Sequence, residues 1–459
     1  MDDYDLTVPQ GFARGDYQGI FRQLRAEDPV HWTVGRLKKG FWSITKYDDV
    51  RAIFSDADNF CSQLGTFVPS PEVDTIPLAE RGRNAMIVMT DPPRHQPLRR
   101  AMNSGFFPRA VLKLEAQARQ VTSAIMDEIA ARGECDFVLD VAAKMPLAII
   151  CQMMDLPRDE WDPVFRWANE IICGEDEEFQ SGRSPDETFL DGARGLFDYS
   201  VKLSHERRRS PGNDIVSDLA TATIFGDHAT DAELGFNGIV FVTGGFETTR
   251  NALSAGMLEF IRNPVQRRRL VENPALMPSA IEEVLRFSSP VTHIMRTATR
   301  DLEYRGRRIR EGDRLALWIA SANYDEDVFA DPFTFDIGRD PNYHVAFGYG
   351  RHFCLGAHLA RLEMRIAFEQ LLQRFPDMEL AGEVQRLASM QFAGIKHMPV
   401  RFTPKRATAK SGSVSLRGLT GGGEIAYGDA ACSGLNKAAG RRRSECATIA
   451  GRGRDRRVQ

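Results

Sequence analysis

The stretch HVAFGYGRHFCLGAHLARLEMRIAF, residues 344–368, places a glycine-rich loop directly before Cys354, a cysteine that opens an amphipathic helix. Gly348, Gly350 and Gly356 let the backbone pass close to the cysteine without steric penalty. Unpaired backbone N–H groups and the positive end of the helix dipole favour the thiolate form. A soft thiolate in this position suits iron. The alternative is a buried, inert cysteine that packs as a small hydrophobe.

The residues around Cys354 resemble a known cofactor loop. The ten-residue pattern resembles the haem-binding loop of the cytochrome P450 family at every signature position, namely Phe347, Gly348, Gly350, His352, Cys354 and Gly356. By this resemblance, Cys354 binds the haem iron, and Phe347 packs against the thiolate and shields it.

Two upstream motifs support the resemblance. Glu283-x-x-Arg286 matches the family's helical Glu-x-x-Arg, and Arg339 in DPFTFDIGRD matches the arginine that completes a structural triad. Alone, Glu-x-x-Arg would be a common surface ion pair worth a few tenths of a kcal/mol. The motif supports the resemblance because it precedes Arg339 and Cys354 in the order and at the distance typical of the family.

The resemblance covers roughly residues 15–405 and follows the soluble bacterial branch of the family. It implies the cytochrome P450 fold, a single triangular domain that is mainly α with small β-sheets. Haem b would be buried between a long central helix and the helix that carries the cysteine. The expected haem-thiolate monooxygenase domain is residues 1–405.

Hydrophobic periodicity agrees with a mainly helical chain, since apolar residues recur at i, i+3 and i+4 in most segments. The predicted helices cover residues 16–28, 110–133, 187–209, 231–263, 277–289 and 355–376. The predicted strands are short and cover residues 30–34, 41–45, 313–323 and 397–402. No internal repeat is found in the sequence.

The helix predicted over residues 231–263 contains two adjacent glycines, Gly244 and Gly245, each of which should cost about 1 kcal/mol relative to alanine. By the resemblance, these glycines allow a local widening where dioxygen sits above the iron. Glu247 and Thr248 then stand where the family keeps an acid and an alcohol that relay protons to the oxygen. The alternative is that Thr248 only bonds back to its own helix.

The two propionates of a haem need cations or hydrogen-bond donors. His95 and Arg99 are spaced i, i+4 after a Pro-Pro helix start, so they share a helix face. The resemblance adds Arg296 and His352 to this set, with His344 as a further candidate.

The segments that line the substrate pocket in the family are largely apolar here, which suits a hydrophobic substrate. The predicted pocket residues are Val240, Val291, His293, Ile294, Met295 and Phe392. His293 and Lys396 are polar intrusions that either contact a substrate carboxylate or ketone or face solvent. Residues 173–189 are very acidic and match the family's mobile lid, which predicts a negatively charged rim.

Composition excludes several classes of function. The chain has 459 residues, 42% of them hydrophobic, and a net charge of -4. Residues 406–459 carry 11 Lys/Arg against 4 Asp/Glu, which leaves about -11 on the rest and argues against nucleic acid as a ligand. No apolar stretch reaches about 18 residues, and the N-terminus is acidic, unlike a secretory signal. A cytoplasmic protein without a membrane anchor is expected.

Residues 406–459 differ from the rest because they are rich in glycine and arginine and contain no Phe or Trp. Such a segment cannot bury enough apolar surface to fold, so it is predicted to be disordered. It is either a functional basic tail or a cloning or read-through remnant.

The chain carries neither a flavin domain nor a cysteine set for an iron–sulfur cluster, so a separate ferredoxin and its reductase are the expected electron donors. The expected docking patch is basic and consists of Arg100, Arg109, Arg351 and Arg361. A monomer is expected.

The predicted function is insertion of one oxygen atom of O2 into a hydrophobic small molecule such as a steroid, a terpenoid, a branched lipid or a polyketide-like compound. One alternative keeps the haem but uses peroxide, or catalyses C–C coupling or desaturation. Another alternative is a haem-binding protein that performs no catalysis.

Overall fold

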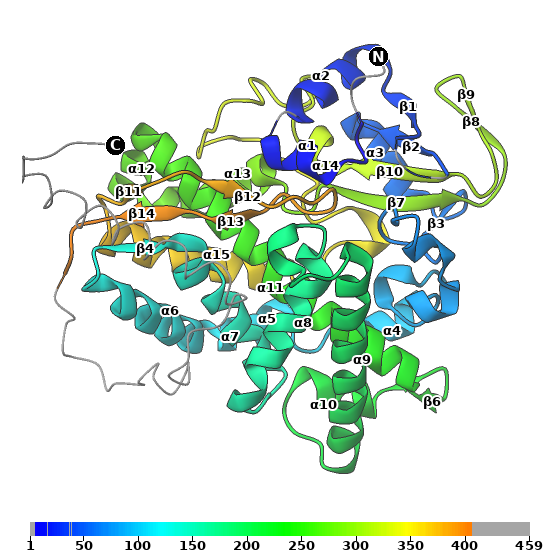
Figure 1. Ribbon diagram of the computed structural model, residues 1–459, viewed down its shortest axis with the longest axis horizontal. Coiled ribbons are helices and arrows are strands. Elements are labelled where there is room, and N and C mark those ends of the chain that lie inside the picture. Colours follow the sequence, from blue (N-terminus) through cyan, green and yellow to red (C-terminus); the bar gives the residue numbers. More distant parts are fainter. Residues whose placement is uncertain (1–4, 16, 36, 38, 406–459) are drawn as a thin grey trace, which may run out of the picture.

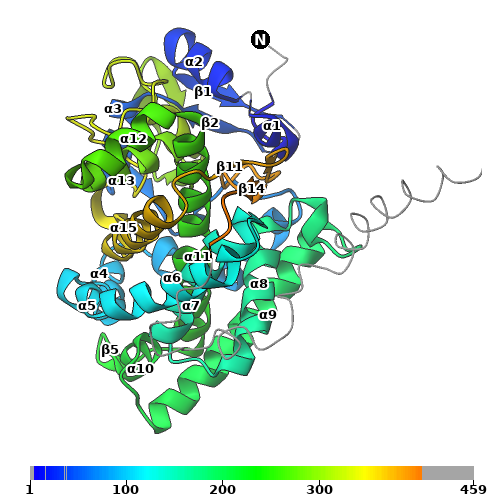
Figure 2. The same cartoon turned by 90° about the vertical axis from the view of Figure 1, so that its left-hand side faces the viewer.

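One helix of 32 residues, α11 (Asp231–Arg262), runs through the middle of the protein (Figure 1). Seen from the side, α8 and α9 lie on one face of α11, and α13 and α15 lie on the other (Figure 2). The structure is a computed structural model that describes residues 5–15, 17–35, 37 and 39–405. The predicted disordered tail, residues 406–459, lies outside the described residues.

The start of α11 is fixed by a reciprocal cap. The hydroxyl of Thr230 accepts from the Glu233 N–H at 3.3 Å, and the Glu233 carboxylate accepts from the Thr230 N–H at 2.9 Å. Each bond satisfies a backbone donor that the first helical turn leaves unpaired. Glu233 also accepts from Arg94 at 2.6 Å, which ties the start of α11 to the segment before α4.

Helices make up most of the described chain. The helices other than α11 are α1 (Pro9–Arg14), α2 (Tyr17–Glu27), α3 (Tyr47–Ser55), α4 (His95–Met102), α5 (Pro108–Lys113), α6 (Glu115–Ala130), α7 (Lys144–Met153), α8 (Trp161–Cys173), α9 (Pro185–Arg209), α10 (Ile215–Thr221), α12 (Pro264–Glu272), α13 (Met277–Ser288), α14 (Ile319–Ala322) and α15 (Ala357–Arg374).

The strands are short. They are β1 (Val30–Thr33), β2 (Phe41–Ile44), β3 (Phe60–Cys61), β4 (Glu134–Asp136), β5 (Thr223–Ile224), β6 (Asp227–His228), β7 (His293–Ala298), β8 (Leu302–Tyr304), β9 (Arg307–Ile309), β10 (Arg314–Trp318), β11 (Glu379–Leu380), β12 (Gln385–Arg386), β13 (Ile395–His397) and β14 (Pro399–Arg401).

The largest sheet has the order β1-β2-β10-β7-β3. β10 pairs with β2 in parallel, and the other neighbours are antiparallel. A three-stranded sheet, β11-β14-β4, and a two-stranded hairpin, β12-β13, lie on the other side of the molecule (Figure 1). The small sheets confirm the predicted class, which is mainly α with little β.

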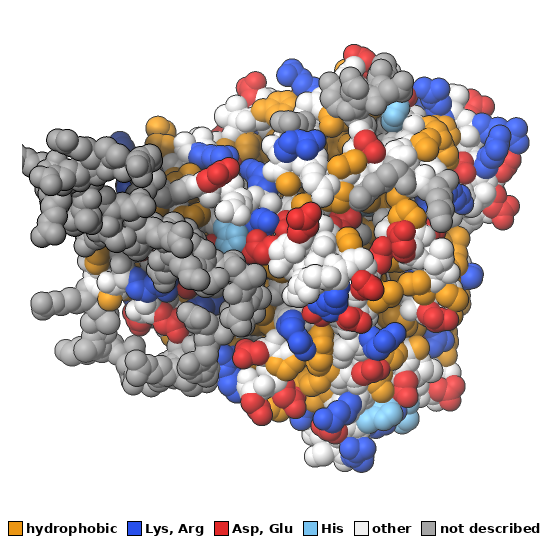
Figure 3. All heavy atoms as spheres, in the orientation of Figure 1, with side chains coloured by type: hydrophobic (Ala, Val, Ile, Leu, Met, Phe, Trp, Pro, Cys, Tyr) orange, Lys and Arg blue, Asp and Glu red, His pale blue; other side chains and the backbone are white. Residues whose placement is uncertain are grey.

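The core is divided between helices and sheet. The main apolar cluster joins residues of α6, α7, α11, α13 and α15, and a second cluster lies between α3 and the largest sheet. On the face seen in Figure 3, acidic and basic side chains are intermixed with apolar ones. Among the residues that the structure describes, no helix combines the length and the apolar character needed to cross a bilayer.

The six helices predicted from periodicity are present. One of them is divided, and one predicted strand is shorter than expected. The helix predicted over residues 110–133 is divided into α5 and α6, because the backbone turns at Leu114. The strand predicted over residues 313–323 ends at Trp318, and the chain continues as the short helix α14. Periodicity missed α7 and strand β7 because these elements are buried on most sides, where the polar residues that reveal a period are scarce. It also missed α3, α8 and α12, although these helices carry polar residues.

Candidate active site

The loop before α15 winds tightly around Cys354. Gly348 and Gly350 have φ values of 70° and 71°, in the left-handed region that glycine adopts at little cost. A Cβ on Gly350 would lie 3.0 Å from the Phe54 carbonyl oxygen, so this glycine also permits close packing against α3. The Cys354 N–H donates to the Phe347 carbonyl at 2.9 Å. The geometry of the loop therefore favours glycine at Gly348 and Gly350, as predicted, whereas Gly356 has a negative φ and open space around it.

The electrostatics of Cys354 differ from the sequence-based prediction. The helix begins at Ala357, so the cysteine precedes it and does not open it. Burial raises the pKa of the Cys354 thiol, and the Gly356 N–H, Arg99 and Arg361 only partly oppose this rise. The loop and the helix dipole alone therefore do not produce the predicted thiolate. A coordinated metal ion deprotonates a thiol outright and would supply the missing stabilisation.

The two glycines of α11 have different surroundings. A Cβ on Gly244 would meet no atom within 4 Å, whereas one on Gly245 would lie 3.0 Å from Cδ1 of Ile150 on α7. Gly244 is exposed in the middle of an otherwise buried helix. α11 continues as a regular α-helix through both residues. The structure therefore does not show the local widening of the helix that was predicted here. Gly244 leaves open space beside the helix, and Gly245 allows α7 to approach.

Thr248 and Glu247 have different partners. The Thr248 hydroxyl donates to the Gly244 carbonyl at 2.9 Å, which is the back-bond considered as its alternative role. Glu247 is fully buried, forms an ion pair with Arg250 on the next turn, and accepts from Asn251 at 3.1 Å. Burial raises the pKa of the Glu247 carboxyl, while Arg250 opposes the rise.

Glu247 is also connected to α8. The Cys173 thiol at the end of that helix lies 3.9 Å from one Glu247 oxygen and 3.5 Å from the Arg250 guanidinium. The other Glu247 oxygen, Oε2, has no hydrogen-bond partner among the described residues. The sequence identified the acid but not Arg250 and Cys173, which fix its position. The i, i+3 spacing of Glu247 and Arg250 was the available signal.

Four predicted haem-binding residues lie together in one group, the cation group, which consists of the buried His95 and Arg296 and the partly buried Arg99 and His352. The rings of His95 and His352 are 4.3 Å apart, and Arg99 donates to the Phe353 carbonyl at 2.6 Å. Arg296 is 3% exposed. α4, β7 and the cysteine loop bring these residues together although they are distant in the sequence.

The cation group lacks compensating negative charge. Burial, followed by repulsion from Arg296, lowers the pKa of His352 to about 2. Burial and Arg99 lower the pKa of His95 to about 4, and only Asp91 opposes this. The His95 Nε2 atom is buried and has no partner among the described residues. This site is therefore suited to a ligand that carries negative charge.

His344 does not belong to this group. Its Nε2 lies 3.1 Å from Glu282 of α13, and its Nδ1 accepts from the Ala346 N–H at 3.2 Å. Glu282 also binds both ends of the Arg361 guanidinium, at 2.7 and 2.8 Å. The structure thus places His344 in an ion-pair cluster on α13 rather than with the predicted propionate ligands.

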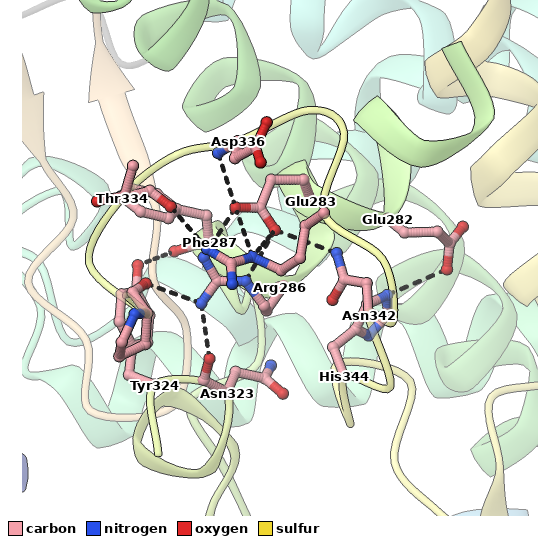
Figure 4. A network of polar contacts seen from close by, with 12 residues as sticks. Glu282, Glu283, Arg286, Phe287, Asn323, Tyr324, Thr334, Asp336, Asn342 and His344 are labelled. Carbon is pink, nitrogen blue, oxygen red and sulfur yellow. Dashed lines mark hydrogen bonds and ion pairs between the residues drawn. The ribbon is translucent and has the colours of Figure 1, made fainter. Parts of the chain in front are cut away.

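The predicted triad is present, with Glu283 and Arg286 fully buried (Figure 4) and Arg339 partly buried. Arg286 binds both oxygens of Glu283, at 2.8 and 2.9 Å, and Arg339 donates to the same carboxylate at 3.1 Å. Arg286 also donates to the carbonyls of Asn323 and Pro332, at 2.8 and 2.9 Å. The pair is therefore not a surface ion pair but a link between α13 and loops distant in the sequence.

Arg339 extends this link along the segment that precedes the cysteine loop. It donates to the carbonyls of Ala330 and Thr334, at 2.6 and 3.0 Å. The Asn342 amide donates to Glu283 at 3.1 Å (Figure 4). Asn342 was not identified from the sequence, and no motif distinguished it from other polar loop residues.

The predicted pocket residues on β7 do not share a face, because side chains of a strand alternate. His293 and Met295 point into the core, and Ile294 belongs to the opposite side with Arg296. The His293 ring lies 4.7 Å from Trp318, and its Nε2 accepts from the Val68 N–H at 3.3 Å. His293 is fully buried, so the alternative that it faces solvent is wrong, and its contact with a substrate stays a prediction.

The other predicted pocket residues remain candidates. Val240 and Val291 are half-buried, and Val291 forms a β-bridge with Phe392. The ring of Phe392 lies 5.4 Å from that of Phe67. Phe392 and Leu387 form an apolar cluster with the end of α8.

Lys396 and the acidic segment after α8 are paired with each other. Lys396 lies 2.9 Å from Asp176 and 3.2 Å from Glu178. Arg183 lies 2.7 Å from Glu170 and 3.0 Å from Asp191. Lys396 therefore compensates part of the negative charge of residues 173–189, and the negatively charged rim stays a prediction.

Comparisons with known proteins agree with this geometry. The family described as cytochrome P450 matches residues 184–401. A steroid C26-monooxygenase of Mycolicibacterium smegmatis is 36% identical over 402 residues, covering 85% of this chain and 92% of its own. A methyl-branched lipid omega-hydroxylase of Mycobacterium tuberculosis is 37% identical over 396 residues, covering 84% and 91%.

A solved structure supports the same conclusion. A Mycobacterium marinum cytochrome P450 in complex with pseudoionone superposes with a TM-score of 0.81 at 31% identity, covering 87% of this chain and 99% of that one. The chain belongs to the cytochrome P450 family. It has the fold of that family and is a haem-thiolate monooxygenase whose cofactor is haem b.

Replacing Glu283 by Gln should destabilise the protein strongly, because two buried arginines would lose their anion. We expect the free energy of unfolding to fall by about 3–5 kcal/mol. Denaturant titration measures this loss. The matched control is Arg262→Gln, which removes an i, i+3 pair of the same kind with Glu259, but with the arginine side chain 51% exposed. That control should lose less than about 1 kcal/mol, and equal losses would contradict the structural role of the triad.

Proposed function

We propose that Cys354 binds the haem iron and that the cation group binds the two haem propionates. The observation that carries this proposal is that the cation group, whose positive charge is not balanced by carboxylates, lies beside the cysteine loop, which itself contributes His352. Two carboxylates would compensate the charge of Arg99 and Arg296 and give His95 Nε2 a partner. Gly348 and Gly356 shape the loop, and Phe347, which stacks on Arg361 at 4.6 Å, shields the sulfur.

The proposed distal side is the open space beside Gly244. Bound haem supplies activation of O2 and insertion of one oxygen atom into a C–H bond. Thr248 lies one turn from Gly244, and its hydroxyl can exchange the back-bond at Oγ1 for a proton donation toward this space. Glu247 would resupply the proton, since its pKa is raised by burial and one of its oxygens is unpaired.

The proposed substrate is a hydrophobic molecule such as a steroid, a terpenoid or a branched lipid. The half-buried Val240, Val291 and Ile294, together with Phe392, offer apolar contacts that orient a ligand mainly by shape. The two relatives named for steroid and methyl-branched lipid oxidation point to the same class of substrate.

We propose that a ferredoxin, itself reduced by a ferredoxin reductase, donates electrons at the surface near Cys354. Arg100, Arg109 and Arg351 are exposed and available to an acidic partner. Arg361 is bound to Glu282 and stacks on Phe347, so it is left out of this patch. We further propose that residues 1–405 form the catalytic domain of a monomeric, cytoplasmic enzyme.

The Cys354→Ser variant should lose the strongly red-shifted Soret band that the reduced, carbon-monoxide-bound protein gives through thiolate ligation. The measurement is the carbon-monoxide difference spectrum. The control is Cys135→Ser, which alters a buried cysteine on β4 and should keep the band. Persistence of the band in Cys354→Ser would refute the assignment of the iron ligand.

The Thr248→Ala variant should divert reducing equivalents from product to hydrogen peroxide, because proton delivery to the oxygen loses its donor. We expect product formed per electron to fall by at least about tenfold. The control is Thr243→Ala, whose hydroxyl makes the same type of back-bond, to Ile239 at 2.8 Å on the same helix. If both variants uncoupled equally, the back-bond rather than proton delivery would explain the effect.

The Arg109→Gln variant should slow reduction by ferredoxin by roughly threefold at low ionic strength, because one attractive charge is removed. The difference from wild type should vanish in about 0.5 M salt, where exposed charges are screened. Stopped-flow reduction measures both effects. Arg310→Gln, beyond the end of β9, serves as the charge-matched control and should reduce at the wild-type rate. A rate independent of salt would exclude electrostatic docking.

A further inference from the structure

The acidic turn after α8, residues 174–180, is fastened to the hairpin formed by β12 and β13. The carboxylate of Asp176 accepts from the Ala388 N–H at 3.0 Å, and that of Glu175 accepts from the Met390 N–H at 3.1 Å. Lys396 on β13 binds both Asp176 and Glu178. The turn is therefore held by backbone donors and by a lysine of one hairpin.

His397, the next residue of β13, bridges two carboxylates from different parts of the fold. Its Nδ1 lies 2.7 Å from Asp136 on β4, and its Nε2 lies 2.7 Å from Glu178 on the acidic turn. A neutral imidazole has one N–H, so only the imidazolium can donate to both carboxylates. The bridge thus requires the charged form of His397.

The acidic turn borders the proposed distal site. Cys173, directly before the turn, contacts Glu247 and Arg250 of α11. The hairpin that holds the turn carries Phe392, which packs in one apolar cluster with Ile172 of α8. β13 lies beside α11 and contacts it (Figure 1). Displacement of the turn would therefore loosen the end of α8 beside the proposed pocket.

We propose that His397, in its charged form, is a latch that holds the acidic turn against the β12–β13 hairpin and limits access to the substrate pocket. The contacts of His397 with Asp136 and Glu178 support the latch itself. Its effect on substrate access rests on the proposed function. Glu178 is the carboxylate that the latch releases, and Asp136 anchors the latch to β4.

The charge of the latch depends on pH in a definite direction. Hydrogen bonds with Asp136 and then Glu178 raise the pKa of His397 from 6.5 to about 9. Its contribution to stability is complete below pH 6.5 and is lost as the pH rises through about 9. Burial raises the pKa of Glu178, but His397 and Lys396 lower it overall, so this partner stays charged down to its depressed pKa. The latch is therefore closed at neutral pH.

Other charged groups surround the latch. The remaining charged side chains on the elements that pack against β13 include Lys396 on β13, Arg386 on β12, Asp140 on the π-helix Val138–Ala142, and the Glu247–Arg250 pair on α11. Asp140 is paired with Arg132 at 2.8 Å, and the pair on α11 is internally compensated. Lys396 is the other cation that pairs with Glu178 among the described residues, so it holds part of the turn when His397 is neutral.

The test compares His397→Gln with wild type in the haem-loaded, full-length protein. Hydrogen exchange at neutral pH should become on the order of tenfold faster in residues 174–180, with α6 and α15 unchanged, because a charge-assisted bond is lost locally. The control is His31→Gln, which removes a histidine–carboxylate pair of 2.9 Å with Asp28 at similar exposure. Exchange within about twofold of wild type, or loosening spread through α6 and α15, would overturn the latch.

The effect on access is tested with 4-phenylimidazole, whose binding to haem iron is followed by absorbance. Its association should accelerate in His397→Gln by a factor similar to the exchange effect. Between about pH 7 and about pH 10 it should accelerate in wild type but not in the variant. Local loosening without faster association would overturn the gating role. The exchange experiment stands even if the proposed substrate pocket is wrong, so the two failures are distinguishable.

A double-mutant cycle identifies the partner. Glu178→Gln should loosen the acidic turn at least as much as His397→Gln does, because it removes the bond to His397 and also weakens the pair with Lys396. The double variant should be no looser than Glu178→Gln alone, because the His397 bond is already lost in that variant. Additive effects on exchange would show that the two residues act separately and would overturn the bridge.

Discussion

One buried carboxylate shared by two arginines holds the part of the protein that presents the cysteine. Glu283 binds Arg286 on its own helix and Arg339 on the segment that leads toward Cys354. A buried charge without its partner is costly, so none of the three can be lost without disturbing the others. The arginines also donate to carbonyls of loops that otherwise lack regular structure. The position of the cysteine loop therefore depends on electrostatics at some distance from it.

The proposed haem site uses the opposite arrangement, an excess of one charge. The cation group combines four basic side chains with one nearby carboxylate, Asp91, and burial makes the positive forms of its histidines unfavourable. Repulsion among these basic side chains therefore destabilises the folded protein, and a dianionic cofactor would remove this repulsion. The same reasoning applies to Cys354, because burial raises the pKa of its thiol and the proposed bond to iron would stabilise the thiolate. Both features link cofactor binding to the stability of the surrounding loops.

Sequence reasoning was most successful where a short motif determines local geometry. The positive φ values at Gly348 and Gly350 and most long helices agree with residue type and spacing, and the triad agrees with the family resemblance of its motifs. It failed where a side chain's environment depends on strands and helices distant in the sequence. His293 was assigned to the pocket because its neighbours in the sequence were, although the alternation on β7 turns it into the core. The pairing of His344 with Glu282 was hidden for the same reason.

Gly244 lacks a side chain at a position where the space beside the helix and the packing of the protein can change independently. Elsewhere along α11, enlarging a buried residue forces its neighbours to move, and at Gly245 a new methyl group would press on Ile150. At Gly244 a new methyl group would meet no atom of the described residues within 4 Å, so a substitution there would narrow the proposed distal space with little effect on the protein around it. A substitution at that position could therefore change substrate preference at little cost in stability.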